Sequence, residues 1–240
     1  MNIVGERVSF VDRVIRILER VEYRRAETDE DKAAIFRMRH DAYTRNGTIE
    51  ARPSGMFQDS FDETPNAWLI AVFIDGELAS SIRLHISASI DLPLPAMVVY
   101  SDVVTPHLRS GHCLIDASKH VNRLRFTREF PEMPYITMRP GLLAEQYFDA
   151  DYITGACRAE NQGAFRRMLN VVNWAPPREY PQLGGLWALM AYDCPALRAK
   201  THHRYPFYVS SSAERRSLFW KSSNSFEDAR RTIGERKLAN

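Results

Sequence analysis

The pattern of apolar and polar residues predicts two neighbouring strands near the middle of the chain. Residues 67–74 are apolar at both parities, as expected for a strand that is buried on both faces. Asp75-Gly76 follows directly and is a strong signal for a tight hairpin turn. The returning segment, 77–86, alternates between apolar and polar residues, which places Arg83 on the more polar side of the strand. We therefore expect a β-hairpin with Arg83 facing a polar region.

Two helices are predicted before this hairpin. Residues 6–20 place Val8, Val11 and Ile15 on one face and charged residues on the other, which indicates an amphipathic helix. This helix either packs on the domain or makes peripheral contact with a membrane or a partner. Residues 31–43 form the second helix, and Thr28 or Asp29 caps its start.

The remaining elements alternate between strands and helices. Further strands are expected at 21–26, 113–121, 151–159, 171–175 and 187–192, and further helices at 101–109, 140–148, 161–170, 210–221 and 225–237. This order favours an α/β (α+β) fold with a mixed central sheet flanked by helices. We expect three parts: an N-terminal amphipathic helix (1–20), a core domain (21–209) and a C-terminal helical extension (210–240).

Composition narrows the class of protein. With 240 residues and 45% hydrophobic residues, the chain can bury a full core. A net charge of +2 gives no general case for nucleic-acid binding. The three cysteines are far apart and lack a metal-ligand spacing, so we expect neither a disulfide framework nor a metal site. Without a secretory signal or an apolar run of roughly 20 residues, we expect a bacterial-type cytoplasmic protein.

Arg39 gives the first indication of chemistry. On a helix its neighbours three and four residues away are apolar or aromatic, so its guanidinium either reaches the surface or pairs with an anion. Two carboxylates, Asp59 and Asp62, follow about twenty residues later, and Arg83 lies on the returning strand. We expect these four side chains to form an ion-pair network, either at a ligand site or as a purely structural link between helix, loop and sheet.

Four motifs, read together and in order, resemble those of a known group of enzymes. They are Phe36-Arg-Met-Arg39-His-Asp-Ala-Tyr43, Phe57-Gln-Asp59-Ser-Phe-Asp62, Leu78-Ala-Ser-Ser-Ile-Arg83-Leu and Ile115-Asp116-Ala-Ser-Lys119. Over about residues 22–175 the chain resembles the acyl-homoserine-lactone synthases (LuxI type). It resembles more closely the long-chain N-acyl amino acid synthases (FeeM type). Both are branches of the GNAT acyltransferase fold, which the resemblance implies for residues 21–209.

The chain departs from the family pattern in three places. Asp116 stands where the family has glutamate, and Lys119 where it has arginine, so a carboxylate clamp there would be looser. The tryptophan that helps lactone synthases bind S-adenosylmethionine is missing after Tyr43, which counts against that branch. An Arg/Gln-x-x-Gly-x-Gly/Ala loop, which holds the CoA pyrophosphate in ordinary GNAT enzymes, is also missing. This second absence fits an acyl carrier protein as the donor.

The resemblance implies direct attack of an amine on a fatty acyl thioester. In this reading Asp116 and Arg39 are the catalytic residues, with Asp116 as the general base and a backbone N–H near 117–119 as the oxyanion donor. The residues implied in substrate binding are Tyr43, Asp59, Asp62, Arg83 and Lys119. Asp116 is alternatively an ordinary acid at a strand end. In a regular strand Asp116 and Lys119 face opposite sides, so they share a site only where the strand bulges or ends.

The implied partners are an amino acid and an acyl carrier protein, with no nucleic acid and no bound cofactor. The donor would be the acyl-phosphopantetheine of the carrier protein, which is acidic and would dock on Arg123, Arg125 and Arg128. Candidates for an acyl-chain tunnel are Met133, Tyr135, Met138, Leu142, Leu143, Tyr147 and Phe148. Two alternatives stay open at this point: a lactone synthase that uses S-adenosylmethionine, and a non-catalytic GNAT-like binding module.

Overall fold

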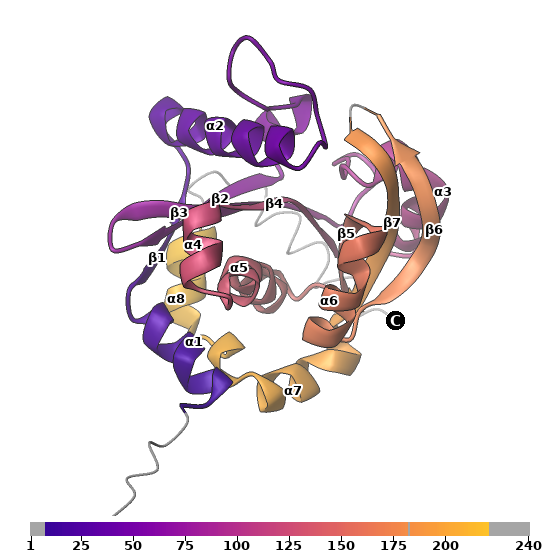
Figure 1. Ribbon diagram of the computed structural model, residues 1–240. Coiled ribbons are helices and arrows are strands. Elements are labelled where there is room, and N and C mark those ends of the chain that lie inside the picture. Colours follow the sequence, from indigo (N-terminus) through magenta and orange to yellow (C-terminus); the bar gives the residue numbers. More distant parts are fainter. Residues whose placement is uncertain (1–7, 182, 221–240) are drawn as a thin grey trace, which may run out of the picture.

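A seven-stranded sheet runs through residues 8–181 and 183–220, the part of the chain that the computed structural model describes (Figure 1). The strands lie in the order β1-β2-β3-β4-β5-β7-β6. Their bounds are β1 Val21–Arg25, β2 Ala67–Ile74, β3 Glu77–Ser87, β4 Leu114–Asn122, β5 Tyr152–Arg158, β6 Val172–Tyr180 and β7 Leu183–Asp193. Neighbouring strands are antiparallel except β4 and β5, which are parallel. The predicted mixed sheet with flanking helices is confirmed.

Helices cover both faces of the sheet. Their bounds are α1 Phe10–Leu18, α2 Asp29–Arg45, α3 Met97–Arg109, α4 Leu124–Glu129, α5 Met133–Phe148, α6 Ala159–Leu169, α7 Cys194–Arg204 and α8 Ser212–Phe219, with the 3₁₀ turns η1 Ser60–Glu63 and η2 Pro206–Tyr208. Helix α2 lies over one face, and α5 lies over the other (Figure 1). Two of the buried clusters, one centred on α2 and one on α3, lie on the opposite face from the largest cluster, which surrounds α5.

Several local predictions are confirmed in detail. Strand β2 spans 67–74 as expected, and Asp75 and Gly76 both have positive φ, as a tight hairpin turn requires. Thr28 caps α2 by accepting a hydrogen bond from the backbone N–H of Asp31. The first helix was predicted with the wrong face: α1 turns Val14 and Ile17 into the core, whereas Ile15, expected on the apolar face, is exposed. In the described part of the chain, the structure contains no helix that has both the length and the apolar character to cross a membrane.

Other boundaries were predicted wrongly. The helix expected at 101–109 ends where predicted, but a further helical turn from Met97 precedes it across a kink at Tyr100. The helix expected at 140–148 begins at Met133, and Pro140 lies inside it. Helix α6 begins before Asn161 and has no side-chain cap. Helix α7 was not predicted, and the helix expected at 225–237 lies outside the described residues.

The separation of β4 from β5 is the feature of the fold that makes room for a site. The two strands pair only through 114–116 and 152–154, whereas β4 continues along β3 as far as Asn122. Gly155 follows the last pair, and a Cβ at this position would lie 2.9 Å from the carbonyl oxygen of Ala117. The close approach therefore requires glycine at the point where the strands begin to part.

A bulge in β4 lies beside this opening. Between the pairs Ser81–Val121 and Arg83–Ser118, β3 has one residue and β4 has two. Lys119 is one of these two β4 residues, and its φ is +53°. A β-bulge changes which face of the sheet the next side chains occupy. A bulge in β4 is what the sequence analysis required for Lys119 and Asp116 to share a site, and the strand contains one.

Candidate active site

Two cavities meet where β4 and β5 separate. The smaller cavity has a volume of about 160 Å³, and the larger has a volume of about 390 Å³. Five residues line both of them: Tyr43, Ser118, Lys119, Ala156 and Trp187. A molecule in one cavity can therefore reach a molecule in the other at this junction.

The smaller cavity contains most of the site residues that the sequence indicated. Tyr43, Asp59, Arg83, Asp116 and Lys119 all line it. They come from α2, the loop before η1, β3 and β4, so the sheet and the α2 face together bring them to one place. The rest of its lining is mainly apolar or aromatic: Phe57, Ser60, Phe61, Pro95, Val98, Ser118, Ala156, Tyr180, Pro181, Leu183 and Trp187.

A buried ion-pair network supports this cavity from behind. Arg39 Nη1 donates to Asp62 Oδ1 at 2.7 Å, and Arg83 Nη1 donates to the same oxygen at 2.9 Å. Arg83 also pairs with Asp59, and Lys119 Nζ lies 3.2 Å from Asp59 Oδ2. The loop is fixed locally as well, because the backbone N–H of Asp59 donates to Asp62 Oδ2 at 2.9 Å. Helix, loop and sheet are thus connected through two carboxylates.

The network keeps both carboxylates ionised. Burial alone would raise the pKa of Asp59, but its hydrogen bond to Arg83 and the charges of Arg83 and Lys119 hold that pKa well below its usual range. Burial likewise opposes ionisation of Asp62, and the charges of Arg39 and Arg83 lower its pKa all the same. The loop before η1 therefore carries two fixed negative charges.

Arg39 lies deeper than the other members of the network. Its side chain is fully buried, and it is absent from the residues that line either cavity in the described chain. Its guanidinium carbon lies 5.3 Å from the centroid of the Phe36 ring, and Asp62 is its ionic partner. Burial lowers the pKa of Arg39 despite that partner. Any influence of Arg39 on a ligand must pass through Asp62 and Arg83.

Lys119 occupies the junction of the two cavities. Its Nζ lies 4.4 Å from the centroid of the Phe57 ring and 5.8 Å from that of Tyr43. Burial lowers its pKa to about 8, although the charge of Asp59 acts in the opposite direction. Lys119 is therefore a mostly charged ammonium held between two aromatic rings and one carboxylate.

Asp116 is the carboxylate in the smaller cavity that is best suited to accept a proton. It is 2% exposed, and its Oδ2 accepts a hydrogen bond of 2.6 Å from the backbone N–H of Ala96. Burial raises its pKa to about 6, against the opposing effects of that hydrogen bond and of the charge of Arg83. A carboxylate with this pKa is ionised at neutral pH and can still hold a proton during a reaction.

The larger cavity passes from the junction to the face of the sheet that α5 and α6 cover. On that face its lining is apolar: Ile82, Met138, Ile153, Phe165, Leu169, Val171 and Met190. Met138 was among the side chains expected to form an apolar tunnel. Met133, Leu142, Leu143 and Phe148 lie in the core cluster instead and are not among the lining residues of this cavity.

Part of the lining could not be found from the motifs. Tyr180 and Trp187 come from the β6–β7 hairpin, and Val98 comes from α3. The backbone N–H of Gly184 donates to the carbonyl of Thr48 at 2.9 Å, which holds this hairpin against the end of α2. No local spacing connects these segments in the sequence. In the described part of the chain, no group of three or more His, Cys, Asp or Glu side chains is arranged to hold a metal ion.

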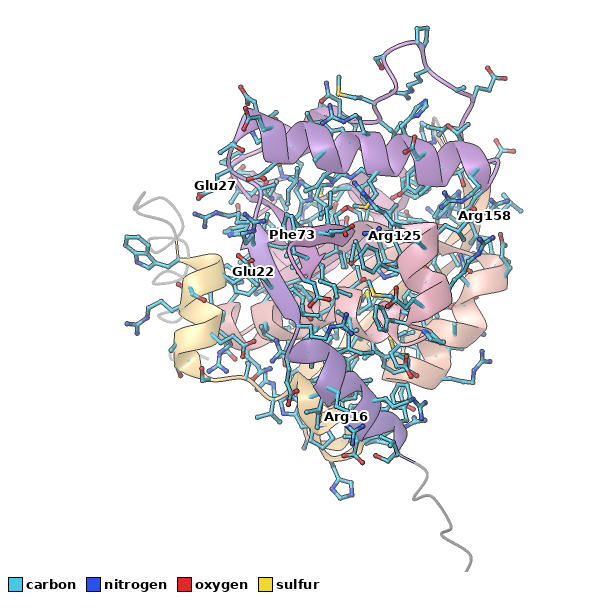
Figure 2. The ribbon with its side chains drawn as sticks, turned by 60° about the vertical axis from the view of Figure 1, so that its left-hand side comes forward. Arg16, Glu22, Glu27, Phe73, Arg125 and Arg158 are labelled. Carbon is cyan, nitrogen blue, oxygen red and sulfur yellow. The ribbon has the colours of Figure 1, made fainter. Side chains whose placement is uncertain are left out.

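Exposed arginines gather at α4. Arg123, Arg125 and Arg128 are all exposed at or within α4, and Arg125 pairs with Glu77. Arg123 also lines a hollow of about 360 Å³ together with Arg37 and Arg45 of α2. Figure 2 shows Arg125, on α4, and Arg158, which lines the larger cavity, on the same side of the molecule.

Comparison with known proteins identifies one matching sequence family and several solved structures of the same fold. The sequence model described as N-acyl amino acid synthase FeeM matches residues 34–193. The solved structure of FeeM, an N-acyl amino acid synthase from uncultured soil microbes, superposes with a TM-score of 0.63 at 16% identity, over 78% of this chain and 98% of FeeM. A search of curated protein sequences found no match.

Lactone synthases share the fold at a greater distance. The CoA-dependent acyl-homoserine lactone synthase BjaI has a TM-score of 0.54 at 15% identity, over 78% of this chain and 89% of BjaI. The acyl-homoserine lactone synthase LasI has the same TM-score at 12% identity, over 75% of this chain and 94% of LasI. Since the family model covers most of the described residues, the chain belongs to the FeeM family and is an N-acyltransferase of the GNAT-like superfamily.

Proposed function

We propose that the protein transfers a long acyl chain from an acyl carrier protein to the α-amine of an amino acid. The observation that carries this proposal is the junction of two unlike cavities. The smaller one presents charged groups and Asp116, and the larger one presents an apolar wall. An amine in the first and an acyl thioester in the second would meet beside Lys119, which lines both.

An α-amino acid fits the chemistry of the smaller cavity. The hydrogen bonds of Arg83 are directed to Asp59, Asp62 and Ser118. Lys119 has one carboxylate partner at 3.2 Å, so its ammonium has further donors for the carboxylate of an acceptor. The amine of the acceptor would then lie toward Asp116, and its side chain would lie among the aromatic residues of the cavity.

The proposed reaction is a direct aminolysis. Asp116, directly or through one water, takes a proton from the acceptor amine as the nitrogen attacks the thioester carbonyl. The C–N bond forms and the negative charge on the carbonyl oxygen is stabilised by a backbone N–H near 117–119. The C–S bond then breaks, and the proton passes to the departing thiolate. Arg39 supports this step as a positioning residue, because Asp62 and Arg83 separate it from the cavity.

A carrier protein fits the outer surface as the source of the thioester. Acyl carrier proteins are acidic, and opposite charges accelerate association and orient the partners. Arg123, Arg125 and Arg128 lie on one short segment, next to the hollow that Arg37 and Arg45 line. The phosphopantetheine arm would enter between β4 and β5, where the strands no longer pair.

Mass spectrometry of products tests this proposal. The purified protein is incubated with dodecanoyl acyl carrier protein and the twenty amino acids, and parallel reactions contain dodecanoyl-CoA or S-adenosylmethionine. A new N-dodecanoyl amino acid from the carrier-protein reaction supports the proposal. An acyl lactone that forms only with S-adenosylmethionine would reassign the acceptor, and product only from dodecanoyl-CoA would reassign the donor. The Asp116→Asn variant should give at least about 100-fold less product.

A further inference from the structure

The junction of the two cavities contains a primary amine of the protein itself. Lys119 lines both cavities, and its side chain is 9% exposed. Its Nζ lies 3.2 Å from Asp59 Oδ2 and 4.4 Å from the centroid of the Phe57 ring, and both of these residues line the smaller cavity. The ε-amine therefore lies in the cavity from which an acceptor amine would attack.

The bulge in β4 is what brings this amine to the cavity. A regular strand would turn Lys119 to the side opposite Asp116, whereas both residues line the smaller cavity. The φ of +53° at Lys119 lies in the left-handed region, which lysine rarely adopts. Such backbone conformations persist where the surrounding structure enforces them, and they are concentrated at functional sites.

Three hydroxyl or thiol groups that line the cavities are poorer nucleophiles. Ser118 Oγ accepts a hydrogen bond from Arg83 Nε at 3.1 Å, and this cationic donor draws electron density from the oxygen. Burial raises the pKa of Tyr43 to about 12 and that of the Cys157 thiol to about 11. Both groups are therefore protonated at neutral pH, and a thiol attacks a thioester only as its thiolate.

The surroundings of Lys119 favour its uncharged form by comparison. Burial is the main cause that lowers its pKa to about 8, and the charges of Arg83 and Arg39 act in the same direction, against that of Asp59. About one tenth of the ε-amine is uncharged at pH 7, and about half is uncharged at pH 8. An uncharged lysine amine that is held beside an activated carbonyl is a competent nucleophile.

We propose that Lys119 is a self-acylation site, whose Nζ takes the acyl group from a bound thioester when the smaller cavity holds no acceptor. This inference rests on the proposed thioester donor and adds a reaction that inactivates the protein. The bond between Nζ and the carbonyl carbon forms, the C–S bond breaks, and the proton lost by the nitrogen passes to the departing thiolate. The product is an amide, which is stable where the thioester was reactive.

A bound acceptor protects Lys119 in this scheme. The carboxylate of an amino acid pairs with the ammonium and favours the charged form, which has no lone pair for attack. Acylation removes one positive charge from the ion-pair network and leaves Arg39 and Arg83 balanced by Asp59 and Asp62. The attached chain then blocks the junction, so the protein switches itself off when donor is present and acceptor is scarce.

Intact-protein mass spectrometry followed by peptide mapping tests this inference. The purified protein is incubated with dodecanoyl-pantetheine at pH 8 without amino acids, and a parallel tube also contains the amino-acid pool. Lys119→Arg keeps a positive charge on a group that is not deprotonated, and Lys200→Arg is the same substitution at an exposed lysine. Hydroxylamine treatment distinguishes an amide, which survives, from a thioester at Cys157, which is cleaved. Circular dichroism checks that each variant is folded.

The wild type should gain one dodecanoyl group, located at Lys119 and resistant to hydroxylamine. Lys119→Arg should reduce this labelling by at least about tenfold, and Lys200→Arg should leave it unchanged. The initial rate should rise between pH 7 and pH 8 and level off above about pH 8, as the ε-amine becomes fully uncharged.

Three results would overturn the inference: no adduct, an adduct of equal extent in Lys119→Arg, or an adduct that hydroxylamine removes. Labelling that is equally fast while N-acyl amino acid forms from the pool would overturn it as well, because an acceptor would then give no protection. Failure of the proposed function has a different signature. An adduct at Lys119 without any N-acyl amino acid from the pool would refute the proposed acceptor and support self-acylation.

Discussion

The ion-pair network predicts that its two sides contribute unequally to stability. Arg39, Arg83 and Lys119 supply three positive charges, and Asp59 and Asp62 supply two negative charges. The network therefore has one excess positive charge. Removing a negative partner increases the excess, whereas removing Arg39 balances the charges.

Asp62→Asn is the more severe of the two changes. It leaves Arg39, whose side chain is fully buried, with no ionic partner among the described residues. Loss of one member of a buried pair costs about 3–5 kcal/mol, because the remaining charge stays desolvated. For a chain of this size about 1 kcal/mol lowers the melting temperature by about 2–4 °C. We therefore expect a fall of at least about 6 °C at pH 7.

Arg39→Met should cost less. Asp62 keeps Arg83 at 2.9 Å and the backbone N–H of Asp59 at 2.9 Å. The loss is one charge-assisted hydrogen bond, worth about 1.5–3 kcal/mol, and it is partly offset because the buried guanidinium no longer has to be desolvated. Activity should still fall, since Asp62 and Arg83 lose one of the contacts that fix their positions.

Thermal unfolding followed by circular dichroism checks this reasoning. The double variant Arg39→Met/Asp62→Asn should melt at a higher temperature than Asp62→Asn alone, because the stranded cation has been removed. Arg37→Met, an exposed position on the same helix, is the control and should change stability by less than about 0.5 kcal/mol. Two results would refute this: Arg39→Met as destabilising as Asp62→Asn, or a double variant that melts no higher than Asp62→Asn alone.

Three further predictions concern the site, the opening and the surface. Because burial raises the pKa of Asp116 to about 6, its ionisation costs stability as pH rises from about 4 to about 6, and Asp116→Asn should be more stable than the wild type at pH 8 by about 3 kcal/mol while losing turnover. A lower melting temperature of this variant at pH 8 would contradict this. Gly155→Ala places a Cβ 2.9 Å from a backbone oxygen of β4 and should weaken donor binding in titration calorimetry, whereas unchanged affinity would show that the strands can shift freely. Replacing Arg123, Arg125 and Arg128 with serine should raise KM for acyl carrier protein and reduce its salt dependence; an equal rise in KM for an acyl-pantetheine donor would argue against carrier docking.

The sequence predicted those parts of the fold that have strong local signals. Strand β2 is apolar at both parities and ends at an Asp-Gly turn, so its position and its partner were both recognisable. Helix α5 was recognised only over its second half. It is buried around most of its circumference, which removes the amphipathic period, and Pro140 inside it looks like a helix start. Helix α7 had a usable signal, because Asp193 caps it and a proline follows in its first turn.

The site was predictable in its charged residues and not in its shape. Arg39, Asp59, Asp62 and Arg83 could be connected because side-chain type and order restrict their pairing. From the sequence, a bulge could be named only as the condition under which Asp116 and Lys119 would share a site. The positive φ of Lys119 depends on the register between β3 and β4, which the sequence does not specify. The aromatic lining from the β6–β7 hairpin depends on tertiary packing across the sheet and has no counterpart in local spacing.

In the proposed reaction the acyl chain passes directly from a carrier-protein thioester to an amino-acid amine at the junction of the two cavities. Intact-protein mass spectrometry of a single turnover tests it most directly, with dodecanoyl acyl carrier protein, excess enzyme and the amino-acid pool. With direct transfer, the carrier should lose its acyl group as an equal amount of N-acyl amino acid appears, and Asp116→Asn should slow both. Release of free dodecanoic acid, transfer of the chain to the enzyme itself, or no loss from the carrier would contradict it.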